Sequence, residues 1–189
     1  MSDLAILPFP SRQAFYNWLL ANHRIEPGVR LRIYKVASGQ PTITWAEAVE
    51  VALCFGWIDS IKNKYDEVSY LQKFGPRRPR SIWSQINCNT VERLIKEGLM
   101  QPSGLAQVEA AKADGRWDAA YASPKDMQVP EDFIKLLAEH PRAHAFFDTL
   151  NKTNRYAIAF RLQTAKRPET RQRRMEVFLQ MLLDGKKFY

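Results

Sequence analysis

Between Phe55 and Asn87 the sequence gathers side chains that could bind an acidic small molecule. A carboxylate, Asp59, follows closely after Trp57, and three arginines surround the prolines of residues 76–80. Guanidinium groups bind carboxylates and phosphates through paired hydrogen bonds, and tryptophan supplies a flat stacking face. We therefore predict a small anionic ligand in a pocket formed by Trp57, Asp59, Arg77, Arg78, Ser81, Trp83 and Asn87.

A structural interpretation of these residues stays open. Asp59 and an arginine could form a structural ion pair, with the tryptophans in the core. A structural ion pair and a ligand-binding site use the same residue types, so the sequence alone does not distinguish them. If residues 58–64 and 68–74 form a hairpin, Arg77 and Arg78 emerge near the end where Trp57 and Asp59 enter. One arginine can then pair with Asp59 while the other remains for a ligand.

Catalysis has less support. The sequence lacks the phosphate-binding pattern GxGxxG, a P-loop, and the patterns CxxC, HExxH and GxSxG. Cys88 is a candidate nucleophile, because a helix N-terminus lowers a thiol pKa, and Asp59 is a candidate acid or base. No positioned partner can be named for either residue. We expect binding without catalysis and without a cofactor.

A metal site is not predicted. His140 and His144 have the spacing of two ligands on one helix face. Pro141 between them marks a helix start, so we expect His140 to lie outside the helix that carries His144.

The basic C-terminal region suggests an alternative function. The chain has a net charge of +8, and residues 152–174 hold eight basic side chains against one acidic side chain. Such an excess indicates an anionic partner, but it is explained equally well by a helix face that is exposed to solvent and binds nothing. The alternative is non-specific binding of nucleic acid, with Arg167, Arg171 and Arg174 contacting phosphates from one side of a helix.

Composition indicates an ordered globular protein, with 46% hydrophobic and 12% aromatic residues. The first residues lack the basic region and the apolar run of a secretory signal. No stretch approaches the roughly 20 apolar residues that a membrane helix requires. Two cysteines are compatible with reduced thiols. We expect a cytoplasmic protein that does not insert into membranes.

Periodicity predicts an α+β fold, in which a small, mainly antiparallel sheet with helices is followed by a C-terminal helical bundle. Ser11, a capping box at Thr44–Glu47 and Asn89 each begin a predicted helix. Alternation predicts a strand at Val29–Tyr34.

Prolines and polar residues predict the breaks between these elements. Pro76 and Pro79 argue against regular strand pairing from Gly75 to Arg80. The polar stretch 122–128 is the best candidate for a linker. We therefore predict an α+β domain at residues 1–122 and a helical module at residues 129–189.

Three segments resemble a known family: GWID (Gly56–Asp59), PRRPRSIWSQIN (Pro76–Asn87) and GRWDAAY (Gly115–Tyr121). Together with NRYAIAF and AKRPETRQRR in the C-terminal part, nearly the whole chain resembles the YdeI/OmpD-associated family, also called bacteriocin-protection proteins. The resemblance implies a bacterial protein of stress or envelope resistance with an indirect link to a porin. It implies no established reaction, cofactor or catalytic residue.

Overall fold

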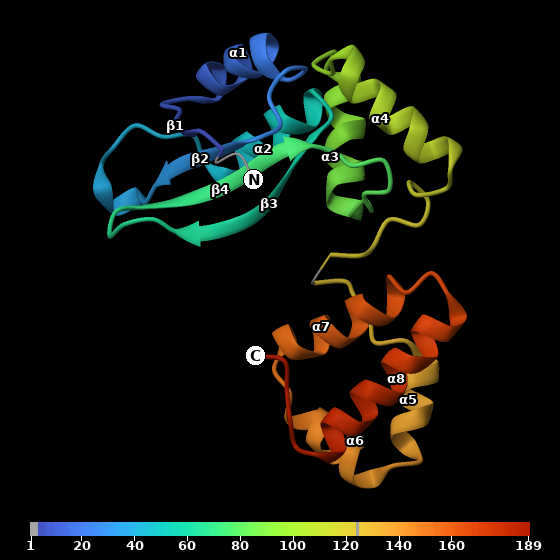
Figure 1. Cartoon of the computed structure of the whole chain (residues 1–189). Coiled ribbons are helices and arrows are strands. Elements are labelled where there is room, and N and C mark those ends of the chain that lie inside the picture. Colours follow the sequence, from blue (N-terminus) through green and yellow to red (C-terminus); the bar gives the residue numbers. More distant parts are fainter. Residues whose placement is uncertain (1–3, 124) are drawn as a thin grey trace. The chain divides into compact units, whose positions relative to one another are not determined.

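The computed structural model describes residues 4–123 and 125–189 (Figure 1). Pro124, which belongs to the predicted linker, lies outside the described residues. The chain divides into two compact units, Met1–Ala120 and Tyr121–Tyr189. Within the described residues, helices accompany a four-stranded sheet, so the fold is α+β as predicted.

The sheet lies in the first unit, and its strands follow the order β1-β2-β4-β3. β2 pairs antiparallel with β4 and β4 with β3, but β1 runs parallel to β2, so the sheet is mixed. Sequence reasoning missed β1, because three residues are too few to show an alternating pattern. The strands are β1 (Ile6–Pro8), β2 (Val29–Tyr34), β3 (Trp57–Lys64) and β4 (Ser69–Pro76).

Helices α1 (Arg12–Asn22) and α2 (Trp45–Cys54) begin at their predicted caps. The Ser11 hydroxyl accepts a hydrogen bond from the Ala14 N–H at 3.2 Å, and the capping box at Thr44–Glu47 is complete. The apolar faces of both helices pack with the sheet into one core, which includes Phe15, Leu19, Leu31, Ala52 and Phe74.

β3 and β4 form the predicted antiparallel hairpin. Their pairing extends farther than predicted, because Gly75 lies opposite Ile58 and Pro76 lies opposite Trp57. The expectation of an unpaired segment from Gly75 is therefore wrong at its first two residues. Pro76 is tolerated because it is the last residue of its strand, where a missing N–H interrupts no later pair.

Helix α3 (Gln85–Lys96) begins earlier than the predicted start at Asn89. The Ser84 hydroxyl caps it by accepting a hydrogen bond from the Asn87 N–H at 3.1 Å. Cys88 therefore lies inside the helix and not before its N-cap, which corrects the prediction. The first unit also contains the short 3-10 helix η1 (Val36–Ser38) and the helix α4 (Pro102–Ala113).

The second unit has helices α5 (Glu131–Ala138), α6 (Pro141–Thr149), α7 (Lys152–Gln163) and α8 (Pro168–Leu183) (Figure 1). Their buried side chains form a second core, which includes Phe133, Leu137, Phe147, Ile158 and Phe178. Pro141 and Pro168 begin their helices, and the Asn151 side chain caps α7. His140 is the N-cap of α6 and so lies outside the helix that carries His144, as predicted.

Across residues 4–123 and 125–189, no helix combines the length and the apolar character that a membrane span needs.

Candidate functional site

The hairpin brings the arginine loop, which we define as residues 77–84, to the start of β3, as predicted. The Arg77 N–H donates a hydrogen bond to the Gly56 carbonyl at 3.1 Å. Trp57 itself belongs to the core, because it is 1% exposed and its indole N–H donates to the His23 carbonyl at 3.2 Å. Its ring therefore belongs to the core and does not form part of the surface.

Arg77 turns into the molecule. It is 6% exposed, and its guanidinium carbon lies 3.6 Å from the centroid of the Trp83 ring. Its Nη1 donates a hydrogen bond to the Ile82 carbonyl at 3.2 Å. A cation stacked on a desolvated aromatic ring contributes about 2 kcal/mol. The Arg77–Trp83 stack therefore fixes the path of the loop.

A second buried arginine, Arg116, ties the loop to the segment after α4. It is also 6% exposed, and it donates from Nη1 to the Ser81 carbonyl at 2.9 Å and from Nε to the Asp114 carboxylate at 2.7 Å. The adjacent Trp117 ring lies 5.0 Å from the Trp83 ring, centroid to centroid. The sequence analysis did not predict Arg116 as a site residue, although Arg116 belongs to the GRWDAAY segment that resembles the known family.

Arg78 and Arg80 face solvent. The Arg78 N–H donates to the Ser81 hydroxyl at 3.1 Å, and the Ser81 N–H donates to the Arg78 carbonyl at 2.9 Å, which closes a turn. Among the described residues, no acidic side chain forms an ion pair with Arg78 or Arg80. Asn87 is half-buried in the first turn of α3. The structure thus joins Arg77, Ser81 and Trp83 in one cluster and leaves two arginines at its surface.

Asp59 has different neighbours. Its Oδ2 accepts hydrogen bonds from the Trp45 indole N–H at 3.0 Å and from the Gln72 amide at 3.3 Å. The interpretation in which Asp59 pairs with a loop arginine is therefore wrong, because neutral donors from α2 and β4 bind this carboxylate. These residues line a recess of about 350 Å³, here called the Trp45–Asp59 recess, together with Ser60, Lys62 and Tyr70.

Both cysteines are free, and their environment disfavours the thiolate. Burial raises the pKa of the Cys88 thiol to about 11, although the positive charge of Arg77 partly opposes the shift. Burial likewise raises the pKa of Cys54 to about 11. Each thiol is thus protonated at neutral pH, which argues against Cys88 as a nucleophile. Within the described residues, no group of His, Cys, Asp and Glu side chains is arranged to hold a metal ion.

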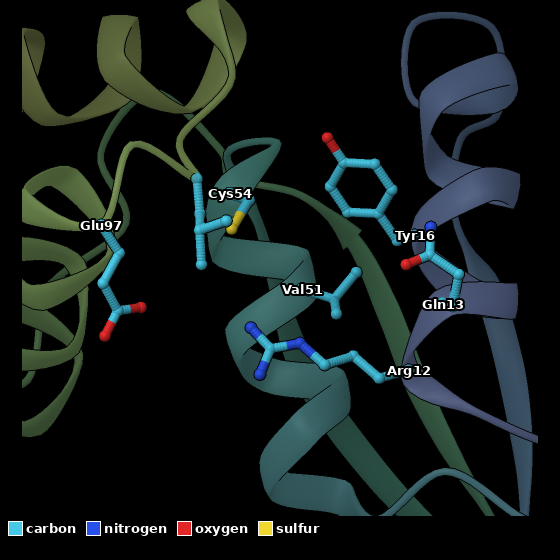
Figure 2. A pocket seen from close by; sticks show the side chains of 7 residues that line it. Arg12, Gln13, Tyr16, Val51, Cys54 and Glu97 are labelled. Atoms are coloured by element: carbon cyan, nitrogen blue, oxygen red, sulfur yellow. The ribbon is translucent and has the colours of Figure 1, made fainter.

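A cavity of about 420 Å³ opens beside α1, α2 and the end of α3 (Figure 2). An ion-pair chain runs beside it, in which Arg12 pairs with Glu50, Glu50 with Arg93, and Arg93 with Glu97. These four charges cancel, so the cavity has no excess charge that favours an anion. Sequence reasoning did not identify the cavity, because its lining comes from three separate segments. The lining residues are Arg12, Gln13, Tyr16, Val51, Cys54, Glu97 and Leu99.

The arginines of the C-terminal alternative are mostly occupied inside the second unit. Arg171 forms an ion pair with Asp132 and lowers the pKa of that carboxyl by donating hydrogen bonds to it. Arg174 donates a hydrogen bond to the Arg161 carbonyl. Arg167 is exposed at the N-cap of α8. The predicted row of three phosphate-binding arginines is therefore reduced to one exposed side chain.

Two different protein families match two different parts of the chain. Residues 7–107 match the model of a domain of unknown function, DUF8412. The chain belongs to the DUF8412 family. Residues 126–185 match the family described as bacteriocin-protection, YdeI or OmpD-associated, which confirms the resemblance for this part of the chain. No curated protein and no solved structure shows a significant match.

The DUF8412 segment contains most of the site residues. The GWID segment and the PRRPRSIWSQIN segment lie within it, outside the bacteriocin-protection match. The GRWDAAY segment, with Arg116 and Trp117, lies between the two matches. The bacteriocin-protection family therefore describes the helical unit, and the arginine loop and the Trp45–Asp59 recess are features of the DUF8412 unit.

Proposed function

We propose that this protein has a bacteriocin-protection-like role, which it performs by binding a small anionic ligand without catalysis. The family match of residues 126–185 supports the role. The arginine loop supports the choice of ligand, because it presents two exposed guanidinium groups that no described acid neutralises. Arg78 and Arg80 are the ligand-binding side chains in this proposal, and Arg77 is a positioning residue.

The anchoring of the loop by two buried arginines is the observation that carries the proposal. Exposed arginines on a mobile loop lose conformational entropy when they bind, which weakens the complex. Here two buried arginines hold the backbone between Arg78 and Ser81, one through Trp83 and the other through the Ser81 carbonyl. The backbone that carries the binding groups is therefore fixed before a ligand arrives.

Thermal denaturation with added anions tests the binding. Inorganic phosphate, citrate and glucose 6-phosphate are titrated separately, since a ligand that binds only the folded protein raises its melting temperature. We expect saturable stabilisation by at least one anion and its loss in the double variant Arg78→Ala/Arg80→Ala. The control Arg142→Ala/Arg173→Ala removes two exposed arginines of the second unit and should keep the response. An unchanged response in the first variant would rule out the loop as the site.

Survival of bacteria tests the role separately. A host without its own copy is supplied with the wild-type protein, with Arg78→Ala/Arg80→Ala or with Arg142→Ala/Arg173→Ala, and is exposed to a bacteriocin. The wild type and the control pair should protect, while the loop pair should not. Equal protection by all three proteins would show that protection does not depend on anion binding by the loop. Absence of protection by the wild type would contradict the bacteriocin-protection-like role itself.

A further inference from the structure

The Trp45–Asp59 recess contains an aromatic ring held in a fixed orientation. Trp45 is 48% exposed at the first position of α2, yet its indole N–H is bound to the Asp59 carboxylate at 3.0 Å. This bond joins the helix to β3 and anchors the edge of the ring. The ring is therefore an ordered, partly exposed apolar surface at a polar recess.

The floor of the recess is polar and preorganised. Gln72 is 3% exposed, and its amide donates to Asp59 Oδ2 and to the Ser60 carbonyl, at 3.3 Å and 3.2 Å. Among the described residues, no donor forms a hydrogen bond with Asp59 Oδ1. One carboxylate oxygen is therefore held in position and remains able to accept a hydrogen bond from a ligand. The strand pairing shifts register between Asp59 and Lys62, an irregularity that is common beside binding sites.

The charges of the recess balance. The Lys62 ammonium lies 4.1 Å from the centroid of the Tyr70 ring, so this ring already has a cation on its face. Lys62 also offsets the negative charge of Asp59 within the same recess. This arrangement favours a neutral ligand with several hydroxyl groups over an anion or an ammonium ion.

We propose that the Trp45–Asp59 recess is a saccharide-binding site. The C–H groups of a pyranose face carry partial positive charge and are attracted to the negative face of an indole ring. Its hydroxyl groups can donate to Asp59 Oδ1 and accept from Lys62. The volume of about 350 Å³ lies within the range of small-ligand pockets, about 300–1,000 Å³. This inference goes beyond the proposed function, because none of these residues belongs to the arginine loop.

Saturation-transfer NMR of the full chain tests this inference with methyl glycosides of glucose, galactose and N-acetylglucosamine. We expect transfer to the C–H protons of at least one glycoside. Trp45→Ala should weaken its binding at least tenfold, whereas Trp45→Phe should retain part of it. Asp59→Asn should weaken binding severalfold. Lys64→Ala, which alters an exposed residue farther along β3, is the matched control and should leave binding unchanged.

Three results would overturn the saccharide site: no transfer to any of the glycosides, binding that Trp45→Ala leaves unchanged, or stronger transfer to choline or adenosine than to every glycoside. Circular dichroism of each variant confirms folding before titration. Arg78→Ala/Arg80→Ala should bind the glycosides normally, so failure of the anion proposal and failure of the saccharide proposal are distinguishable.

Discussion

The arginine loop and the Trp45–Asp59 recess both adjoin the β3–β4 hairpin, but their charges differ: the recess contains one acidic and one basic side chain, whereas the loop exposes arginines without acidic partners among the described residues. In the recess, the positive charge of Lys62 offsets the negative charge of Asp59, and the neutral donors Trp45 and Gln72 bind the carboxylate. In the loop, Arg77 is buried for support while its neighbour Arg78 faces solvent without an acidic partner. Two arginines one position apart thus have different environments: Arg77 is buried and supports the loop, whereas Arg78 is exposed and is a binding group in our proposal.

Loss of the Arg77–Trp83 stack should have the largest effect on stability. Arg77→Ala removes a desolvated cation–π contact and a hydrogen bond, so we expect the free energy of unfolding to fall by about 3 kcal/mol. Urea denaturation measures the change. Arg78→Ala, one residue away and exposed, should leave stability nearly unchanged. Equal stability of the two variants would show that Arg77 does not support the loop.

This expectation replaces the one drawn from the sequence, which placed Arg77 among the ligand-binding residues. The structure makes anion affinity a poor readout for Arg77, because its loss disturbs the loop as a whole. Binding is therefore measured with Arg78 and Arg80 substituted, and stability with Arg77 substituted.

Arg116→Ala should have the next largest effect. The change leaves the Ser81 carbonyl without its charged donor, and we expect a loss of about 2 kcal/mol, since hydrogen bonds to charged groups contribute about 1.5–3 kcal/mol. Hydrogen exchange should show faster exchange of amides in residues 77–84. Arg93→Ala, which breaks a more exposed ion-pair chain, is the control and should not change exchange in the loop.

Asp59→Ala should affect stability less, by about 1 kcal/mol. The variant loses the acceptor for the Trp45 indole and the Gln72 amide. The exposed indole can bind water instead, and the buried Gln72 amide keeps its hydrogen bond to the Ser60 carbonyl. Tryptophan fluorescence anisotropy should fall as the Trp45 ring gains freedom, and Lys64→Ala should leave it unchanged. A loss as large as that of Arg77→Ala would mean that the recess is a structural element comparable to the loop.

The local elements could be predicted from the sequence because their causes lie close together in the chain. The Ser11 cap and the capping box at Thr44–Glu47 depend on residues within a few positions of one another, and the β3–β4 hairpin joins two strands that are adjacent in the sequence. Strand β1 could not be predicted, because Ile6–Pro8 acquires its partner only when β2 lies beside it.

The candidate site was only partly predictable for the same reason. The segment that contains Arg77, Ser81 and Trp83 could be selected from its composition, and the hairpin located it correctly at the start of β3. Arg77 turns inward because it stacks on Trp83, and Trp83 packs in turn against Trp117 from a distant segment. The partners of Asp59 likewise come from α2 and β4, and no spacing rule identifies them.

The thiols give an effect on stability that is absent at neutral pH and appears only above pH 9. The pKa of Cys54 and of Cys88 is raised from 9.0 to about 11 in the folded protein. Above pH 9 the unfolded chain therefore loses thiol protons that the folded chain retains, so stability falls as the pH rises from 9 to 11. Urea denaturation across this range should show the fall, and it should be smaller in Cys54→Ala/Cys88→Ala. An identical pH dependence of the two proteins would contradict the burial of both thiols.

Residue-resolved labelling of arginines by phenylglyoxal tests the division of the loop most directly. Mass spectrometry follows each arginine with and without the anion that stabilises the protein. Arg78 and Arg80 should react quickly and become protected by the anion, while Arg77 and Arg116 should react slowly in both conditions. Rapid reaction of Arg77, or anion protection of arginines outside the loop alone, would contradict the assignment of support to Arg77 and of binding to Arg78 and Arg80.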